Sequence, residues 1–384
     1  MIEFKDVSKS FKDKKVLDNI SFNIEDGEFV CIIGGSGCGK TTALKMINRL
    51  INPSSGTIYV NGKDISKENE IELRRNIGYV IQQTGIFPHM TVRENIELIP
   101  KLKNKGKKRN GNEKKEDNKK LLENVKNVLM MVGLNPDEFM DKYPIQMSGG
   151  QQQRVGVARA FASNPDIILM DEPFSALDPI TRNQLQDELV TLQDKMKKTI
   201  VFVTHDMGEA IKLADRICIL NNGKIEQFDT PEKILKNPAN DFVLNFVGKK
   251  RIWDSPDLIK AEDIMIENPI VCISRLKAIK AQTIMRESRV DSVIVIDENR
   301  KFLGKVDASD VASEFSKDKR VMDIMDKNCI CVSPRDSIIS VLNKAKENNM
   351  YTIPVVDNEK LVGLITKSTL VTALSRKYDE SEVE

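Results

Sequence analysis

A glycine-rich segment near the N-terminus constrains the fold of this chain more than any other feature. Residues 34–41 read GGSGCGKT, which fits the pattern G-x-x-x-x-G-K-[ST]. The segment follows the apolar run FVCII and opens TTALKMINRL, whose apolar residues recur at helical spacing. A strand, a tight glycine loop and a helix in this order bind phosphate, because glycines let backbone N–H groups approach an anion closely. The segment therefore predicts an α/β domain that holds a nucleotide.

The residues of this loop have distinct expected roles. Lys40 supplies a positive charge to the β- and γ-phosphates, and the Thr41 hydroxyl is a ligand for Mg²⁺. The N-terminus of the following helix adds a partial positive charge. We expect the nucleotide phosphates to contact Gly34, Gly35, Ser36, Gly37, Cys38, Gly39, Lys40, Thr41 and Thr42.

Two later apolar runs, IILM and TIVFVT, are predicted to be buried strands, and each ends in polar residues. Asp171 and Glu172 follow the first strand, and His205 follows the second. Parallel strands place their carboxyl ends at one edge of a sheet, where open α/β folds bind ligands. Asp171 is expected to hold Mg²⁺, Glu172 to polarise the water that attacks the γ-phosphate, and His205 to contact that phosphate.

A second glycine-rich segment, Ser148-Gly149-Gly150-Gln151, lies far downstream of the first. It opens the helical pattern QQQRVGVARAFA. A serine with glycines at a helix start exposes backbone N–H groups, which form a second anion site. One chain that binds one nucleotide has no evident need of two such loops.

The order of these segments resembles that of the ATP-binding cassette (ABC) ATPases. The phosphate loop is followed by SGGQ, LMDEP, SALD and a strand that ends in histidine, and the resemblance covers roughly residues 1–235. It implies a parallel sheet core with an antiparallel β subdomain and a helical subdomain. It also implies a homodimer that meets head to tail, so that each ATP with Mg²⁺ lies between one phosphate loop and the SGGQ segment of the second copy.

The same resemblance implies roles for further residues. Phe11 matches the aromatic residue that stacks on adenine, and Asp178 matches the residue that bridges the two subunits. Gln82 matches the glutamine that senses Mg²⁺ and contacts the membrane partner, with Gln83 as the alternative register. Lys40, Glu172 and His205 make up the expected catalytic set.

The segment QTGIFPHMTVRENI, close after Gln82, resembles importer ATPases, in which it leads to the surface that docks two membrane permease subunits. His89 is expected on that surface. The net charge of +2 gives no support to a nucleic-acid partner. No apolar run approaches the roughly 18 residues of a membrane helix. We expect a peripheral protein at the cytoplasmic face of the membrane, which meets a substrate-binding protein only indirectly.

The C-terminal third contains an internal repeat. AEDIMIENPIVCIS matches VMDIMDKNCICVS, and SVIVIDENRKFLGKV matches TIPVVDNEKLVGLI. Each copy predicts a strand, a helix, a hairpin and a helix, and two such copies should pack face to face. The repeat resembles a pair of α+β CBS modules. The expected divisions are an ABC ATPase domain at 1–235, a linker with Trp253 at 236–258, CBS modules at 259–316 and 317–377, and an acidic tail at 378–384.

A cassette with two CBS modules resembles the ATP-binding subunit of the glycine betaine/carnitine/choline importers. CBS pairs often hold adenine nucleotides through a threonine and an aspartate three residues later, but each copy here has only half of that pair. The resemblance implies cyclic di-AMP or another adenine nucleotide as regulator, with contacts from Tyr351, Ile353 and Lys367. The alternatives are a tail that only dimerises, or one that responds to salt through charged patches.

Two further interpretations stay open on sequence alone. Residues 103–120 hold nine Lys/Arg against three Asp/Glu and no apolar residue, which predicts a disordered, solvated loop, or alternatively a contact to anionic lipid or RNA. The chain as a whole predicts an ATPase that drives uptake of a quaternary amine osmolyte. The alternatives are import of another small solute and a soluble ABC ATPase whose CBS tail senses a metabolite.

Overall fold

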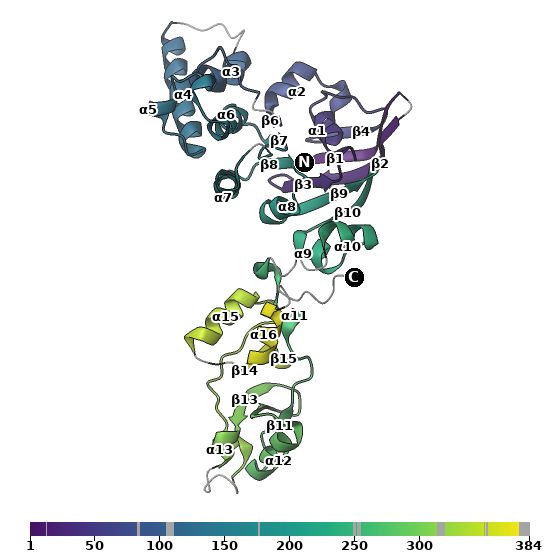
Figure 1. Ribbon diagram of the computed structural model, residues 1–384, viewed down its shortest axis with the longest axis vertical. Helices are drawn as coiled ribbons and strands as arrows, with labels where there is room; N and C mark the ends of the chain where they lie inside the picture. Colours follow the sequence, from purple (N-terminus) through teal and green to yellow (C-terminus); the bar gives the residue numbers. More distant parts are fainter. Residues whose placement is uncertain are drawn as a thin grey trace. The chain divides into compact units, whose positions relative to one another are not determined.

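The computed structural model describes residues 1–12, 14–82, 85–104, 111–175, 177–248, 251, 255–312, 319–348, 350 and 352–375. The chain divides into two compact units, Met1–Val247 and Gly248–Glu384, and each is described by itself. Figure 1 shows the elements of both units.

The first unit is built on a six-stranded sheet with the order β10-β9-β3-β8-β7-β6. Its strands are β3 (Phe29–Gly34), β6 (Ile77–Val80), β7 (Ile167–Asp171), β8 (Thr199–Val203), β9 (Arg216–Asn221) and β10 (Lys224–Asp229). All neighbours are parallel except β9 and β10. Strands β3, β7 and β8 are buried along their whole length, which explains their continuous apolar sequences.

A second, antiparallel sheet of four strands has the order β2-β1-β4-β5. Its strands are β1 (Ile2–Phe11), β2 (Lys14–Ile24), β4 (Ser55–Val60) and β5 (Lys63–Asp64). Asn61 and Gly62 have φ angles of 50° and 75°, as a two-residue hairpin between β4 and β5 requires. This sheet is the antiparallel β subdomain that the resemblance implies.

Helices surround these sheets, and α3 to α6 lie together as a separate group (Figure 1). The helices of the first unit are α1 (Lys40–Ile47), α2 (Glu70–Asn76), α3 (Val92–Asn104), α4 (Gly111–Met131), α5 (Pro136–Phe139), α6 (Gly149–Phe161), α7 (Pro179–Met196), α8 (Met207–Leu213), α9 (Pro231–Lys236) and α10 (Asp241–Val247), with 3₁₀ turns at Ile65–Lys67 and Pro144–Gln146. Alternate residues of β3 enter two different cores, with Cys31 and Ile33 on one face and Val30 and Ile32 on the other.

The basic tract at 103–120 differs from its prediction. Helix α4 begins at Gly111, so the expectation of a loop is wrong for residues 111–120, whereas 105–110 lie outside the described residues. Lys and Glu are good helix formers, and Glu116 pairs with Lys120 one turn later at 2.7 Å. The helix then continues into an apolar stretch that packs in the core, which anchors its charged first half.

The first unit also continues past residue 235, the boundary predicted from the sequence, and ends at Val247. Val243 and Val247 of α10 are buried in the same core as the inner strands. Trp253 of the expected linker lies outside the described residues.

The second unit contains the two repeats. The first holds β11 (Val271–Ile273), α12 (Ala278–Ser288), β12 (Ser292–Ile296), β13 (Phe302–Asp307) and α13 (Ala308–Ala312), and the second holds α15 (Ile338–Glu347), β14 (Thr352–Asp357), β15 (Lys360–Thr366) and α16 (Lys367–Ser375). A 3₁₀ turn at Pro256–Leu258 precedes the first repeat. In the second repeat the predicted first strand is reduced to one parallel bridge, Val332 to Val355.

The two repeats pack face to face, as predicted, because Ile294 and Ile296 of the first share a core with Leu361 of the second. They also exchange short helices. Helix α11 (Ala261–Ile264), at the start of the first repeat, packs in the core of the second, and α14 (Val321–Ile324), at the start of the second, packs in the core of the first. The division at 316/317 therefore describes the sequence repeat and not two separately filled cores.

Candidate active site

A pocket of about 610 Å³ opens at the carboxyl edge of the parallel strands. It brings the phosphate loop together with the ends of β6, β7 and β8, as the sequence analysis expects. Its lining residues are Val16, Ser36, Gly37, Gly39, Lys40, Thr41, Thr42, Gln82, Glu172 and His205. Gln83 lies outside the described residues.

Val16 lines this pocket, but it belongs to no motif and nothing in the sequence marks it. Phe11, the expected adenine contact, is 45% exposed at the end of β1 and is absent from the described lining of the pocket. The Nζ of Lys9 lies 4.9 Å from the centre of its ring. The structure therefore leaves Phe11 accessible for stacking but does not place it against the phosphate loop.

The glycines of the loop fall into two kinds. A Cβ on Gly34 would overlap the carbonyl of Leu220 and the buried thiol of Cys38, so only glycine fits there. A Cβ added to Gly35 or Gly37 would meet no heavy atom within 4 Å, so the space beside this part of the backbone is open. The first kind fixes the loop on the sheet, and the second leaves room for a phosphate to approach the N–H groups.

Lys40 is buried, with 7% of its surface exposed. Its Nζ donates hydrogen bonds to the carbonyls of Gly34 at 2.8 Å and Gly35 at 3.0 Å. The loop itself thus holds the ammonium at the pocket, where it can exchange these carbonyls for phosphate oxygens.

Thr41 and Asp171 form the best candidate for a Mg²⁺ site. The Thr41 hydroxyl donates to Asp171 Oδ1 at 2.8 Å, and Asp171 is only 4% exposed. Burial raises the pKa of the Asp171 carboxyl, whereas the hydrogen bond from Thr41 lowers it. Hydroxyl and carboxylate oxygens fit a hard divalent cation, and such a cation would offset the cost of burying this carboxylate.

Glu172 lies where the other functional side chains converge. Its backbone is left-handed, with φ 43°, and its N–H donates to the Val203 carbonyl at 2.9 Å. Gln82 Nε2 donates to Glu172 Oε2 at 3.1 Å, and His205 Nδ1 lies 3.4 Å from the same oxygen. The bond to β8 and the turn at Glu172 thus direct its carboxylate into the pocket.

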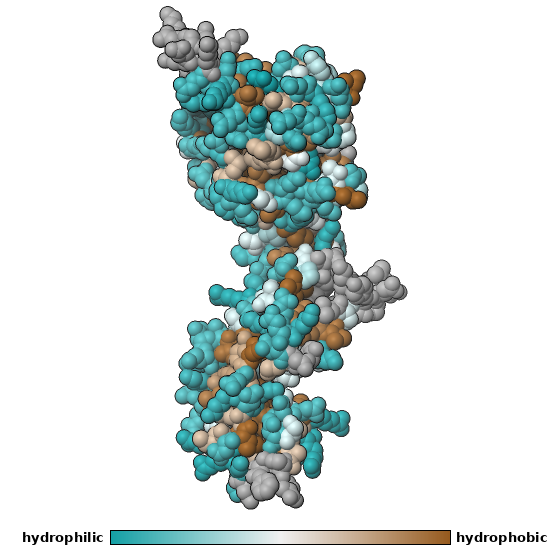
Figure 2. Space-filling model, turned by 90° about the vertical axis from the view of Figure 1, so that its left-hand side faces the viewer, coloured by the Kyte–Doolittle hydropathy of each residue, from teal (hydrophilic) through white to brown (hydrophobic). Residues whose placement is uncertain are grey.

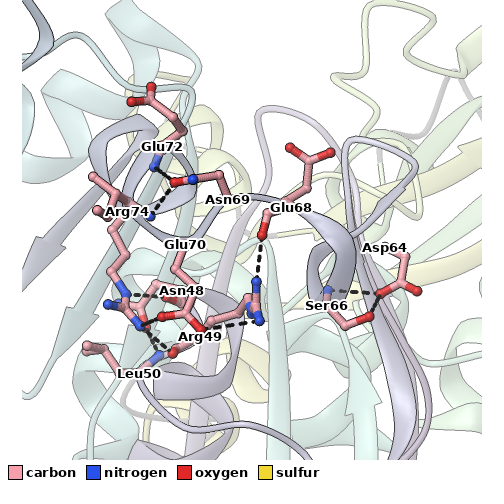
Figure 3. A network of polar contacts seen from close by, with 11 residues as sticks. Asn48, Arg49, Leu50, Asp64, Ser66, Glu68, Asn69, Glu70, Glu72 and Arg74 are labelled. Atoms are coloured by element: carbon pink, nitrogen blue, oxygen red, sulfur yellow. Dashed lines mark hydrogen bonds and ion pairs between the residues drawn. The ribbon is translucent and has the colours of Figure 1, made fainter.

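A polar network holds the far end of helix α1, which begins at the phosphate loop (Figure 3). Arg74 of α2 donates to the carbonyls of Asn48 at 3.2 Å and Arg49 at 2.7 Å. Glu70 accepts from Arg74 at 2.9 Å and lies 3.2 Å from Arg49 Nη2. These bonds satisfy the carbonyls of the two residues that directly follow α1, and they fix the end of α1 to the segment that leads into β6.

We expect Arg74→Met to lower the free energy of unfolding by about 1–3 kcal/mol, because the carbonyls of Asn48 and Arg49, directly after α1, lose their donor. Urea denaturation of the full chain measures this. Arg75→Met is the matched control: Arg75 Nη1 pairs with Glu72 at 2.8 Å on the surface, so its loss should cost no more than about 1 kcal/mol. Equal losses of unfolding free energy in both variants would show that the network stabilises the fold no more than a surface ion pair does.

The SGGQ segment lies elsewhere in the chain. Ser148 caps α6, since Gln151 N–H donates to Ser148 Oγ at 3.3 Å and Ser148 N–H donates to Gln151 Oε1 at 3.0 Å. Within the described residues, neither this segment nor Asp178 lines the pocket; Asp178 caps α7 through the N–H groups of Ile180 and Thr181. One copy of the chain does not bring its two glycine loops together.

The residues expected to bind a regulatory nucleotide differ in how accessible the structure leaves them. Ile353 is 1% exposed and packs in the core of the second repeat, so it has no free surface for a base. Lys367 begins α16 and is exposed, whereas Tyr351 lies outside the described residues. Thr366 Oγ1 accepts from the N–H of Thr369 at 3.3 Å, and Thr366 N–H donates to Thr369 Oγ1 at 3.0 Å, so this half of the expected nucleotide motif caps α16.

Comparison with known proteins agrees with this architecture. A family model described as "ABC transporter" matches residues 17–175, and the CBS domain model matches 261–317 and 321–376. The first unit is similar to the dimeric post-hydrolysis state of the ATP-binding cassette MJ0796 bound to ADP and Pi. The TM-score is 0.53 and the identity 37%, over 60% of this chain and 99% of that one. The fold and the pocket thus define an ABC-type ATPase, which hydrolyses ATP.

Similarity to proteins of known name shows which family of ABC ATPases the chain belongs to. The chain is 48% identical over 374 residues to the carnitine transport ATP-binding protein OpuCA of Listeria monocytogenes, covering 97% of this chain and 91% of that protein. It is 46% identical over 374 residues to the glycine betaine/carnitine/choline transport ATP-binding protein OpuCA of Bacillus subtilis, covering 97% and 95%. The chain belongs to the family of ATP-binding subunits of quaternary amine osmoprotectant transporters. In the part that the structure describes, no helix is long and apolar enough to cross a membrane.

Proposed function

We propose that this chain powers the import of a quaternary amine osmolyte, namely glycine betaine, carnitine or choline, and that its CBS tail regulates import by binding cyclic di-AMP or another adenine nucleotide. The observation that carries the ATPase role is the convergence of the phosphate loop, Gln82, Glu172 and His205 on one pocket. Similarity to named osmolyte transport proteins over nearly the whole chain, CBS pair included, supports the cargo.

The working unit is two copies of the chain on two permease subunits at the cytoplasmic face of the membrane, with a substrate-binding protein reached only through the permease. The separation of SGGQ from the phosphate loop within one chain supports a head-to-tail dimer. Figure 2 shows a face that is largely hydrophilic with small apolar patches, which suits a peripheral protein. ATP draws the two copies together, and hydrolysis releases them.

Within the closed dimer, this chain's residues divide the work of hydrolysis. Lys40 and the loop N–H groups bind the β- and γ-phosphates, and His205 holds the γ-phosphate. Glu172 accepts a proton from the attacking water. Thr41, Asp171 and Gln82 would hold Mg²⁺, which supplies positive charge to the phosphates. Ser148 to Gln151 bind the γ-phosphate of the other copy, and Asp178 bridges the copies.

Reconstitution of the purified chain with its permease in liposomes tests this function. Uptake of glycine betaine, carnitine or choline that requires ATP is the expected result. Uptake of another solute, such as methionine, with none of these three would change the cargo. An active ATPase that co-purifies with no membrane protein would instead favour a soluble enzyme with a sensor tail.

Calorimetric titration of the full chain with cyclic di-AMP, AMP and ATP tests the regulatory proposal. We expect cyclic di-AMP to bind with a dissociation constant on the order of micromolar and ATPase-driven uptake to fall. Lys367→Ala should weaken that binding, since an exposed ammonium at the start of α16 is suited to a phosphate. Lys346→Ala, on an exposed position of α15, should not. If only ATP produces heat, that heat comes from the cassette pocket and the tail binds none of these nucleotides. The tail would then be a dimerisation or salt-sensitive element.

A further inference from the structure

A buried carboxylate, that of Glu209, lies behind the candidate site. Glu209 belongs to α8 and is 7% exposed. Its Oε2 accepts a hydrogen bond of 2.6 Å from the hydroxyl of Thr204, which is itself 2% exposed. The same hydroxyl accepts from the N–H of Asp206 at 3.0 Å. Glu209 therefore fixes the residues on both sides of His205 without lining the pocket.

Arg182 of α7 approaches the same carboxylate from the other side. Its Nη2 donates to the carbonyl of Leu177 at 3.1 Å, directly before Asp178. Its Nε is buried, has no hydrogen-bond partner among the described residues, and lies 3.9 Å from Glu209 Oε1. A buried N–H of a charged group without a partner is costly, and a movement of about 1 Å would bring this one within hydrogen-bond distance of Glu209.

Other groups around Glu209 hold it only weakly. Gln186 Nε2 donates to Glu209 Oε1 at 3.4 Å, close to the limit for a hydrogen bond. Burial raises the pKa of the Glu209 carboxyl and Asp206 raises it further, whereas Thr204, Arg182 and His205 lower it. Completion of the Arg182 bond would therefore stabilise a buried charge that is only partly compensated.

We propose that Glu209 is a positioning residue for ATP hydrolysis, which links the segment of His205 to the segment of Asp178 through Arg182. When Asp178 contacts the second copy, Arg182 moves with Leu177 and completes its hydrogen bond to Glu209. Glu209 then fixes the position of His205, because its hydrogen bond to Thr204 holds the residues on both sides of that histidine. Closure of the dimer at one segment is thereby transmitted to the γ-phosphate contact of the same chain. This inference rests on the proposed roles of His205 and Asp178.

The test is Glu209→Gln in the full chain, with steady-state ATP hydrolysis measured over a range of ATP concentrations. Glutamine keeps the size of the side chain and the acceptor for Thr204 but removes the charge that attracts Arg182. We expect kcat to fall about tenfold while KM for ATP changes less than about twofold, because positioning and not ATP binding is lost. The melting temperature should change little, since the glutamine oxygen still accepts from Thr204 and Arg182 Nε makes no hydrogen bond to Glu209 that could be lost.

Asp187→Asn is the matched control. Asp187 pairs with Lys212 at 2.8 Å and joins the same two helices on the surface, so kcat should stay at the wild-type value. Arg182→Met, which alters a side chain that is 30% exposed, should lower kcat as Glu209→Gln does. The two together should lower it no further, because both remove one link.

An unchanged kcat in Glu209→Gln, or additive losses in the double variant, would overturn the inference. Glu172→Gln measured in parallel separates this from failure of the proposed function. If Glu172→Gln is inactive and Glu209→Gln is normal, only the role of Glu209 is wrong. If Glu172→Gln retains normal turnover, the assignment of the hydrolytic site itself is wrong.

Discussion

Glu172→Gln is expected to abolish ATP turnover and leave ATP binding intact. The amide cannot accept the proton of the attacking water, so hydrolysis should fall by about a hundredfold to ten-thousandfold. The substitution preserves shape, and the backbone bond from Glu172 to Val203 does not depend on the side chain. Release of phosphate measures the loss. Because ATP is bound but not consumed, size-exclusion chromatography with ATP should show a stable dimer.

Glu123→Gln, at an exposed position of α4, is the matched control and should hydrolyse ATP normally. Normal turnover by Glu172→Gln would contradict the assignment of the base. Loss of both turnover and ATP binding would mean that Glu172 maintains the pocket, through Gln82 and His205, and does not act on water.

Gly149→Asp is expected to prevent ATP-dependent dimerisation and hydrolysis while ATP still binds to the phosphate loop. A Cβ at Gly149 meets no heavy atom within 4 Å, so the fold accommodates the side chain. The new carboxylate stands at the start of α6, where the γ-phosphate of the second copy would be held, and like charges repel. Hydrolysis should fall by at least about a hundredfold.

The double variant Glu172→Gln with Gly149→Asp tests the effect on dimerisation directly. Glu172→Gln alone should give a dimer with ATP, and the added aspartate should return it to the monomer without loss of ATP affinity. Gly149→Ala is the control, because it fills the same open space without a charge and should lose far less activity. A dimer that persists with aspartate at 149 would place this segment away from the second copy's ATP.

The parallel core and its site could be predicted because burial and function leave separate marks on the sequence. Strands β3, β7 and β8 are buried along their whole length and mostly apolar, since both their faces are covered, and the polar residues at or just after their ends stand at one edge of the sheet. The positions of Lys40, Glu172 and His205 in one pocket follow from that pattern.

Other features depend on tertiary contacts that leave no local signal. Charge composition alone indicated a loop at 111–120, because the apolar half of α4 that anchors this part lies further along the chain. The contact of Val16 with the pocket depends on the path of β2, and Ile353 could be placed in the core only once β14 and β15 were paired. Arg182 and Glu209 belong to different helices, and neither helix pattern marks them as neighbours.

Because the two repeats exchange helices α11 and α14, neither repeat can be gained or lost without the other. A single repeat would leave its own core short of a helix and would expose the helix meant for its twin. The pair is therefore the smallest piece that a gene rearrangement can add to a cassette, remove from it or carry to another protein. An ancestral tail of one repeat would have needed a second molecule to supply the missing helix, which makes duplication and dimerisation alternative solutions to one packing requirement.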